Sequence, residues 1–377
     1  MRVDDIIAKA RAATGLSDMG DPAALVGLEQ LVRASAEEAR LSPAGVQRWE
    51  GSIVGTLSNR LRIVDYLKQH PELLERPVEA PLFVFGLPRT GTTLAINLLN
   101  ADPARRCLLR WEALNSAPPA AAGALHSDPR YVAEQAKLEA AIKYMPHIAA
   151  IHYEDADSPT ECQYAMGLSF CAQIFESSVH IPSYREWFNN ADYLPAFRFH
   201  KQLLQLLQAE NGGRWTLKNP WHPLFLNDLT TVYPDAQLVM THRDPVEVVG
   251  SACSLIRHVR PMFSDEVDLP EIAAQMIGTF DLMIARQNAY RDVHGENSIH
   301  DLRYKDLMKD PIGEMRKIYA HFDEELTQEA ETAMRNLMAE TPKGKHGKHE
   351  YSLEEFGLTA EGVRAHFKDY CDRYGVV

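Results

Sequence analysis

The chain has 377 residues, of which 45% are hydrophobic, so composition allows one α/β core with a helical extension. Its formal net charge of -13 argues against a nucleic-acid binder, whose affinity comes largely from cationic contacts to phosphates. It does not exclude a small anionic ligand, because such a ligand responds to the local field of a cleft.

The cysteines and the N-terminal segment indicate the cellular compartment in which we expect the protein. Five cysteines are an odd number, and none forms a CxxC pair, so we expect no disulfide framework, no metal site and a cytoplasmic location. The N-terminus MRVDDIIAKARAA has early acids and no apolar core, which argues against a signal peptide. No apolar run approaches the length of a membrane span.

Residues 1–78 predict an N-terminal helical extension. Apolar residues recur at helical spacing over 3–13, 22–40 and 43–70, with few breakers. A polar, proline-bearing connector follows at 75–81. We therefore expect the main α/β domain to occupy residues 79–377.

From residue 81 onward, short apolar strands alternate with helices. The expected strands cover 81–87, 214–218, 236–243 and 298–304, and the helices that follow them cover 92–100, 220–231, 245–258 and 311–322. This alternation predicts a P-loop-like parallel sheet flanked by helices on both faces. Residues 104–212 are mostly helical and irregular, and we expect them to form an insertion over the sheet.

The segment GLPRTGTT (86–93) predicts a phosphate-binding turn between a strand and a helix. Its glycines let backbone N–H groups surround an anion, and Thr92 and Thr93 can donate hydroxyl hydrogen bonds to it. The lysine of an NTP-binding P-loop is missing, because Thr92 stands there and the cation lies in the turn as Arg89. No Walker-B aspartate is evident. This combination suits a phosphosulfate better than a magnesium-bound triphosphate.

Basic residues also end two later strands. An Asx residue before a proline predicts a helix N-cap in three segments: KNP (218–220), RDP (243–245) and DP (310–311). The carboxyl ends of parallel strands form the edge at which open α/β sheets bind ligands. Arg89, Lys218 and Arg243 are therefore expected to converge there, and Ser251 could complete a second phosphate site with Arg243.

These motifs together resemble the sulfotransferases that use 3′-phosphoadenosine-5′-phosphosulfate (PAPS). GLPRTGTT resembles their 5′-phosphosulfate loop, HRDPVEVVGS (242–251) their 3′-phosphate motif, and LRYKDLMKDP (302–311) the segment that follows. The fit is closest to the bacterial branch with GxPRSGTT, LKxPxH and HRDP motifs, over residues 80–372. PAPS is then the implied co-substrate, without a metal.

The resemblance assigns binding residues by position. The residues implied to hold the 5′-phosphosulfate are Arg89, Thr90, Gly91, Thr92 and Thr93. Arg243 and Ser251 are implied to hold the 3′-phosphate, with Tyr304 near the nucleotide. Lys343 and Lys345, in KGKHGK (343–348), loosely resemble a basic loop that closes on that phosphate, although a solvated loop is an equal alternative.

Catalysis needs cations for the developing charge and a base for the acceptor proton. We expect Arg89 and Lys218 to supply the cations. For the base two residues stay open: Glu112, placed where tyrosylprotein-type enzymes carry a catalytic Glu, and His222, close after Lys218 as in cytosolic-type enzymes.

The acceptor cannot be identified from the sequence. Trp111, His152 and Glu161 are candidates for contacts with it, and the insertion and the N-terminal helices are expected to form its pocket. A small molecule, a lipid and a glycan all remain possible as the hydroxyl acceptor, and the oligomeric state stays open. The alternative functions are a P-loop nucleotide kinase or NTPase, and a non-catalytic nucleotide-binding protein.

Overall fold

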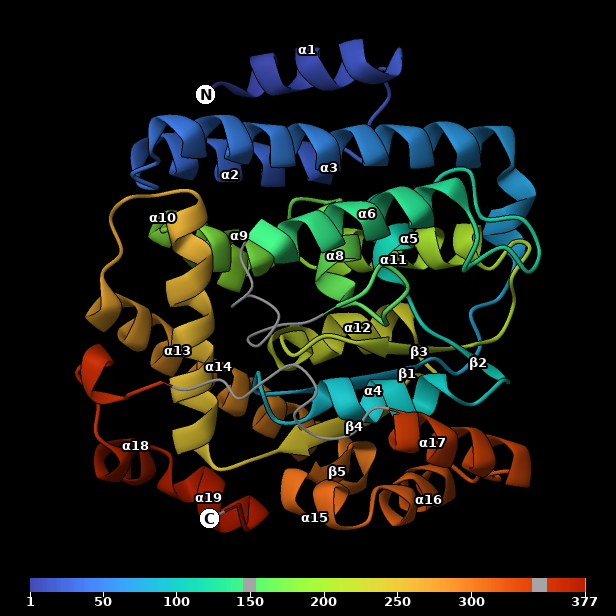
Figure 1. Cartoon of the computed structure of the whole chain (residues 1–377), viewed down its shortest axis with the longest axis vertical. Helices are drawn as coiled ribbons and strands as arrows, with labels where there is room; N and C mark the ends of the chain where they lie inside the picture. Colours follow the sequence, from blue (N-terminus) through green and yellow to red (C-terminus); the bar gives the residue numbers. More distant parts are fainter. Residues whose placement is uncertain (145–153, 341–350, 377) are drawn as a thin grey trace.

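A five-stranded parallel sheet forms the centre of the protein. The computed structural model describes residues 1–144, 154–340 and 351–376. The strand order is β2-β3-β1-β4-β5, and the strands are β1 (Leu82–Gly86), β2 (Arg105–Arg106), β3 (Arg214–Lys218), β4 (Gln237–His242) and β5 (His300–Arg303). Helices flank this sheet (Figure 1). The predicted α/β class with a parallel sheet is confirmed.

Strand β1 lies at the centre of the sheet because both of its faces are apolar. Leu82 and Val84 pack into one hydrophobic cluster with helix α4 (Thr92–Asn100), whereas Phe83 and Phe85 point into a second, larger cluster. All five residues of β1 are buried. This burial on two faces explains why the strand is a continuous apolar run rather than an alternating one.

The helices that follow the strands begin largely where the sequence predicts. Asp244 caps α13 (Pro245–Val259) by accepting from the Val246 N–H, and Asp310 caps α16 (Pro311–His321) by accepting from the Gly313 N–H. The third predicted cap is confirmed only in part: Asn219 Oδ1 accepts from the Trp221 N–H at 3.5 Å, but no helix begins at Pro220. After Asn219 the chain forms the 3-10 turn η2 (His222–Phe225) and then α12 (Leu226–Val232), and neither has a side-chain cap.

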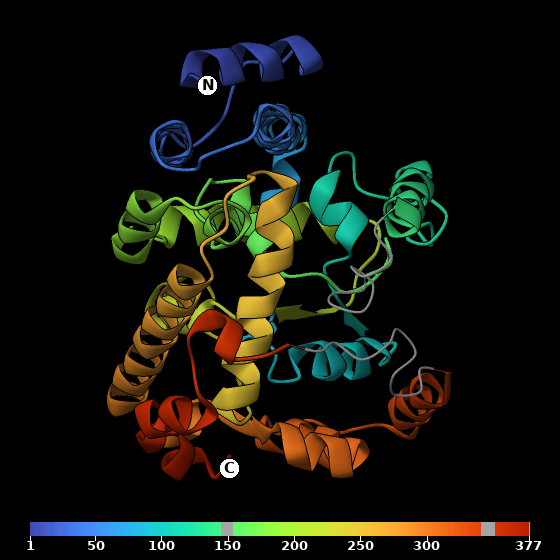
Figure 2. The same cartoon turned by 60° about the vertical axis from the view of Figure 1, so that its left-hand side comes forward.

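The N-terminal helices form a layer at one end of the molecule. They are α1 (Val3–Thr14), α2 (Ala23–Glu37) and α3 (Pro43–Gln69), close to the predicted ranges, and η1 (Pro71–Glu75) follows them. Figures 1 and 2 show this layer at the end opposite the C-terminus. Its buried residues, such as Ile6 and Leu57, belong to the same hydrophobic cluster as Phe83 of the sheet. A domain boundary at residue 78 stays a prediction.

The predicted insertion is helical, with one exception. Its helices are α5 (Arg110–Leu114), α6 (Pro129–Tyr144), α8 (Cys162–Gly167), α9 (Ile174–Ser178), α10 (Pro182–Asn190) and α11 (Leu194–Leu207). Strand β2 was not predicted, because two residues are too few to show a period. It pairs in parallel with β3 at the edge of the sheet.

The C-terminal part encloses the sheet from the other side. It contains η3 (Arg260–Met262), α14 (Leu269–His294), η4 (Glu296–Ser298), α15 (Tyr304–Lys309), α17 (Gln328–Glu340), η5 (Glu354–Phe356), α18 (Ala360–His366) and α19 (Lys368–Tyr374). Within the described ranges, none of the helices combines the length and the apolar character that crossing a bilayer requires.

Candidate active site

The phosphate turn between β1 and α4 depends on its two glycines. Gly86 has φ 148° and Gly91 has φ 101°, in the region where glycine is favoured. A Cβ on Gly86 would lie 2.4 Å from the carbonyl oxygen of Thr241, and a Cβ on Gly91 would lie 2.8 Å from the ring of Tyr304. The turn therefore packs directly against β4 and the start of α15. Arg89 itself has φ 70°, a strained conformation for a residue with a side chain.

The hydroxyl groups of the turn have different positions. Thr90 is fully buried, and its hydroxyl lies 2.6 Å from the Leu87 carbonyl oxygen and 2.5 Å from Thr241 Oγ1. That hydroxyl fastens the turn to β4, so only the backbone N–H of Thr90 is left for an anion. Thr92 and Thr93 line the cavity in front of the turn.

Of the three cations predicted to converge, Arg89 and Arg243 meet at this turn, whereas Lys218 lines neither cavity beside it. Arg89 Nε donates to Ser251 Oγ at 3.0 Å, and Arg243 Nη1 donates to the Arg89 carbonyl oxygen at 3.0 Å. The Arg243 guanidinium lies 4.2 Å from the ring centroid of Tyr304 and also pairs with Glu247. Burial lowers the pKa of Arg89, and repulsion from Arg243 lowers it further. An anion placed between these cations would relieve that repulsion.

Two cavities share this pair of arginines. The first, of about 1060 Å³, is lined by residues from β4, α13, α15 and the C-terminal segment, among them His242, Ser251, Arg303, Tyr351 and Val376. The second, of about 640 Å³, is lined by Thr92, Thr93, Arg110, Glu161, Tyr164 and Trp221, among others. Arg89, Arg243 and Tyr304 line both. The two cavities thus adjoin each other at the phosphate turn.

Glu161 lies at the sheet edge beside the second predicted strand-end cation. It forms an isolated parallel bridge with Lys218, and Lys218 Nζ lies 3.4 Å from Glu161 Oε1. Gln163 donates to the other carboxylate oxygen. Glu161 also favours the charged form of Arg89 electrostatically. A carboxylate is therefore held at the edge of the cavity that contains the phosphate turn, while the Lys218 side chain itself is buried behind it.

The two predicted bases and Trp111 lie in the protein interior, and no cavity beside Arg89 includes them. Glu112 is fully buried and accepts from Arg106 at 2.6 Å; burial raises the pKa of its carboxyl, and Arg106 opposes the rise. His222 packs against Phe83 and Phe197, and burial holds its pKa well below the usual range. Trp111 donates to the Leu125 carbonyl oxygen at 3.0 Å. Neither predicted base therefore lines the two cavities beside the phosphate turn.

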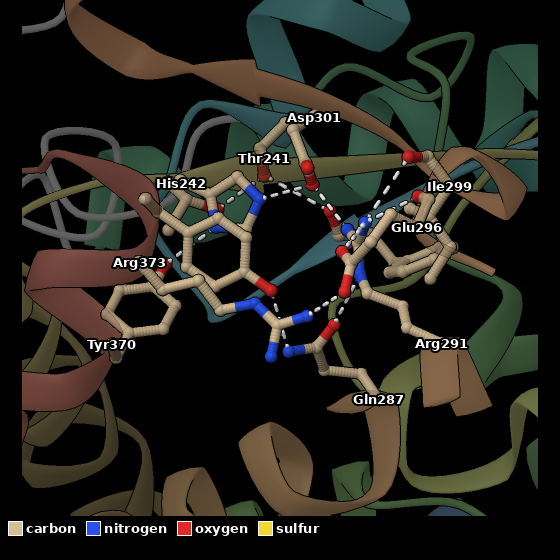
Figure 3. Close-up of polar contacts among 12 residues, drawn as sticks. Thr241, His242, Gln287, Arg291, Glu296, Ile299, Asp301, Tyr370 and Arg373 are labelled. Atoms are coloured by element: carbon tan, nitrogen blue, oxygen red, sulfur yellow. Dashed lines mark hydrogen bonds and ion pairs between the residues drawn. The ribbon is translucent and has the colours of Figure 1, made fainter. Parts of the chain in front are cut away.

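Strand β4 ends in a polar network that fixes the wall of the first cavity. Figure 3 shows Asp301 between His242 and Arg291: Asp301 Oδ1 lies 2.9 Å from His242 Nε2, and Arg291 donates to the same oxygen. On its other side, His242 Nδ1 lies 3.0 Å from the Tyr370 hydroxyl. Helices α14 and α19 thereby hold the residue that precedes Arg243.

Three predicted residues lie outside the described part of the chain: His152, Lys343 and Lys345. In residues 1–144, 154–340 and 351–376, no group of three or more His, Cys, Asp or Glu is arranged to hold a metal ion.

Comparison with known proteins identifies the family. A sequence model of the sulfotransferase family matches residues 81–328. The chain belongs to the sulfotransferase family. It is 34% identical to sulfotransferase STF9 from Mycobacterium avium, with a TM-score of 0.92 over 99% of this chain and 97% of that one. For sulfotransferase STF1 from Mycobacterium tuberculosis the identity is 32% and the TM-score is 0.88, over 98% of this chain and 99% of that one.

A more distant sulfotransferase relative has a named acceptor. The omega-hydroxy-beta-dihydromenaquinone-9 sulfotransferase Stf3 of Mycobacterium bovis is 23% identical over 307 residues, which are 79% of this chain and 75% of the relative. Its name gives an omega-hydroxy dihydromenaquinone as the acceptor.

Several cavity residues of this sulfotransferase were not singled out from the sequence as site residues. Arg110, Gln163 and Gln173 line the second cavity, and all three come from the insertion. Arg110 donates to Glu154 at 3.0 Å, and burial raises the pKa of the neighbouring Tyr164 hydroxyl to about 12. No sequence motif identifies these residues, because they are far from the phosphate turn in the sequence and lie near it only in the folded chain.

Proposed function

We propose that this sulfotransferase transfers the sulfuryl group of PAPS to a hydroxyl group of a lipid-type alcohol. The observation that carries the proposal is the convergence of Arg89, Arg243 and Ser251 with the turn amides, at a cavity that also holds the Glu161 carboxylate. The lipid class comes from the relative whose named acceptor is a menaquinone derivative. The buried, unpaired cysteines of the described chain and its acidic surface fit a cytoplasmic enzyme without nucleic-acid partners.

We propose one orientation for the donor across the two adjoining cavities. We assign the 5′-phosphosulfate to the turn amides, Arg89, Thr92 and Thr93, with the sulfuryl group toward the second cavity. We assign the 3′-phosphate to Arg243 and Ser251 on the first cavity, whose volume of about 1060 Å³ leaves room for the adenosine beside Tyr304. A bisphosphate would satisfy the two cations, which otherwise repel each other.

Glu161 is our candidate for the general base. It accepts the acceptor's hydroxyl proton while the acceptor oxygen attacks the sulfur atom. The bond from sulfur to the bridging oxygen breaks, and that oxygen keeps the electron pair as part of adenosine 3′,5′-bisphosphate. A base within reach of the proton is worth roughly a hundred- to ten-thousand-fold in rate.

The cations stabilise the leaving group. Arg89 and the amides of the turn face the oxygens on which charge develops, and preorganised donors of this kind cost no reorganisation during the reaction. Lys218 acts through Glu161, because its ammonium group lies 3.4 Å from the carboxylate and is itself buried. We therefore describe Lys218 as a positioning residue, not as the second cation on the leaving group.

The test compares donors first and acceptors second. Isothermal titration should show binding of adenosine 3′,5′-bisphosphate without magnesium and at least tenfold weaker binding of ATP with magnesium. Transfer of label from [³⁵S]PAPS to a panel of alcohols and phenols should then yield sulfate esters. Preferred binding of ATP would support the kinase or NTPase alternative. Bisphosphate binding with no transfer to any acceptor would support the non-catalytic alternative.

A further inference from the structure

A groove beyond the second cavity leads to the N-terminal helices. It has a volume of about 580 Å³ and is lined by α3 together with residues of α5, α6, α8 and α9; we call it the α3 groove. It shares six lining residues with the second cavity: Ser52, Gln163, Tyr164, Ile174, Ser178 and Phe263. The α3 groove therefore adjoins the second cavity along these residues, next to the cavity that holds Glu161.

The walls of the α3 groove are shaped for an extended apolar group. Trp49, Val54 and Phe175 contribute apolar surface. On the α3 side, the groove is bounded by backbone without side chains, because Gly51 and Gly55 lie one helical turn apart. A Cβ built on either glycine would meet nothing within 4 Å. Glycine in a helix interior is unfavourable, so its presence at both positions needs a compensating reason.

Buried polar groups without partners lie along the second cavity and the α3 groove. Gln173 lines the second cavity and is 2% exposed, and its enclosed Nε2 group has no hydrogen-bond partner among the described residues. Ser58 is 5% exposed, lines the α3 groove, and its hydroxyl likewise has no partner among the described residues. Buried polar groups in proteins are nearly always hydrogen-bonded, so an ordered water is expected beside each of these two atoms.

The charges at the α3 groove do not favour a strongly charged ligand. Glu134 is paired with Arg110 at 3.4 Å and with Lys137 at 3.7 Å, so two of the charged lining residues already compensate each other. Nothing comparable to the Arg89 and Arg243 pair occurs among the described residues that line this groove.

We infer that the α3 groove binds the apolar chain of the acceptor, so that the enzyme selects alcohols whose hydroxyl group ends a long hydrocarbon chain. The inference rests on the proposed function, since it takes the acceptor hydroxyl to lie at Glu161. The N-terminal helices then select the acceptor by its length, whereas the sheet holds the donor.

A chain-length series tests this selection. Complete burial of one methylene is worth about a fourfold gain in affinity, so kcat/KM should rise at least 100-fold from 1-butanol to 1-dodecanol. Gly55→Leu should place a side chain in the groove and reduce that rise to tenfold or less, with butanol turnover within twofold of the unsubstituted enzyme. The matched control is Gly278→Leu in α14, also a helical glycine with nothing within 4 Å of its Cβ, and it should keep the full rise.

A binding measurement separates this inference from the proposed function. Trp49 lines the groove, so 12-bromododecan-1-ol should quench tryptophan fluorescence more than 1-dodecanol does, in the absence of any donor. The quenching should disappear in Gly55→Leu and persist in Gly278→Leu. Equal turnover of butanol and dodecanol, or quenching that survives Gly55→Leu, overturns the inference and leaves sulfuryl transfer intact. Loss of bisphosphate binding to the unsubstituted protein would instead overturn the proposed function.

Discussion

The proposed donor side and the proposed acceptor side of the cavity are built in opposite ways. On the donor side, Gly86 to Thr93 is one continuous segment, and Arg243 and Ser251 join it from a single strand-to-helix connection. The acceptor side collects residues from α3, the insertion and the loop after α13. A charged, invariant ligand can be recognised by a compact local motif, whereas an apolar chain requires surface from many elements.

Helix α13 connects the two sides. Its first turn follows Arg243, and its far end reaches the N-terminal layer, as Figure 2 shows. There Arg48 donates to the Met262 carbonyl oxygen at 2.9 Å, and the rings of Trp49 and Phe263 lie 5.3 Å apart. Substitutions that leave α13 in place should affect donor and acceptor separately, whereas a shift of α13 would affect both.

The largest effect is expected on the donor side, from Arg89→Ala. Removing this guanidinium should lower kcat/KM by about 10³- to 10⁵-fold, as for arginines that stabilise phosphoryl transfer, and should weaken bisphosphate binding. The control is Arg303→Ala, because Arg303 lines the first cavity with an exposed side chain. Steady-state kinetics and titration of both variants would test the comparison. Similar losses in the two variants would mean that only the overall positive field matters.

On the acceptor side, Glu161→Gln should have the next largest effect. Without the carboxylate, kcat should fall about 10²- to 10⁴-fold, while bisphosphate affinity stays within a few-fold, because the amide keeps the shape but cannot take the proton. Single-turnover transfer from labelled PAPS and titration calorimetry measure the two quantities. An unchanged kcat would remove Glu161 from the chemistry and return the search for the base to the insertion.

Glu112→Gln should change stability instead of chemistry. The substitution leaves the Arg106 guanidinium buried without its counter-charge, at a cost of about 3–5 kcal/mol in the free energy of unfolding. Urea unfolding measures this, and the double variant Arg106→Met with Glu112→Met should recover part of the loss because it buries no charge. A stable Glu112→Gln protein with at least 100-fold lower turnover would instead restore Glu112 as the base.

The sequence predicted the donor side better than the acceptor side, because the donor side is formed by short continuous segments and the acceptor side by residues far apart in the chain. The phosphate turn and the strand-end cations follow from local patterns, since each lies within a few residues of a strand end, and Ser251 follows from its spacing to Arg243 along α13. Strand β2 was missed because it has two residues, and the pairing of Glu161 with Lys218 joins segments 57 residues apart. For the acceptor side one signal was present: the spacing of Gly51 and Gly55 in an otherwise regular helix.

The predicted bases show why a sequence position is weaker than a geometry. Glu112 and His222 were chosen by their distance from motifs along the chain, but each points into the interior from a short helix or turn. Whether a side chain near a strand end faces the cavity or the core depends on packing against distant residues, here Arg106 and Phe197. Local sequence patterns do not predict contacts with such distant residues.

The smallest effect is expected on the donor side, from Glu247→Gln. Glu247 pairs with Arg243 one turn into α13, and its side chain is 50% exposed. A 3′-phosphate must compete with this carboxylate for the same guanidinium, and exposed pairs of this spacing contribute only a few tenths of a kcal/mol. Glu247→Gln should therefore tighten bisphosphate binding about threefold, measured by titration calorimetry, and the gain should shrink as salt screens the charges.

The control for that gain is Glu355→Gln, because Glu355 pairs with Arg257, has similar exposure and does not line the cavity of Arg243. It should leave bisphosphate affinity unchanged. Weaker binding in Glu247→Gln would carry a different meaning: the carboxylate would then be holding Arg243 against Tyr304 in the orientation that receives the phosphate. In that case the donor side, like the acceptor side, would depend on a carboxylate and a cation that position each other.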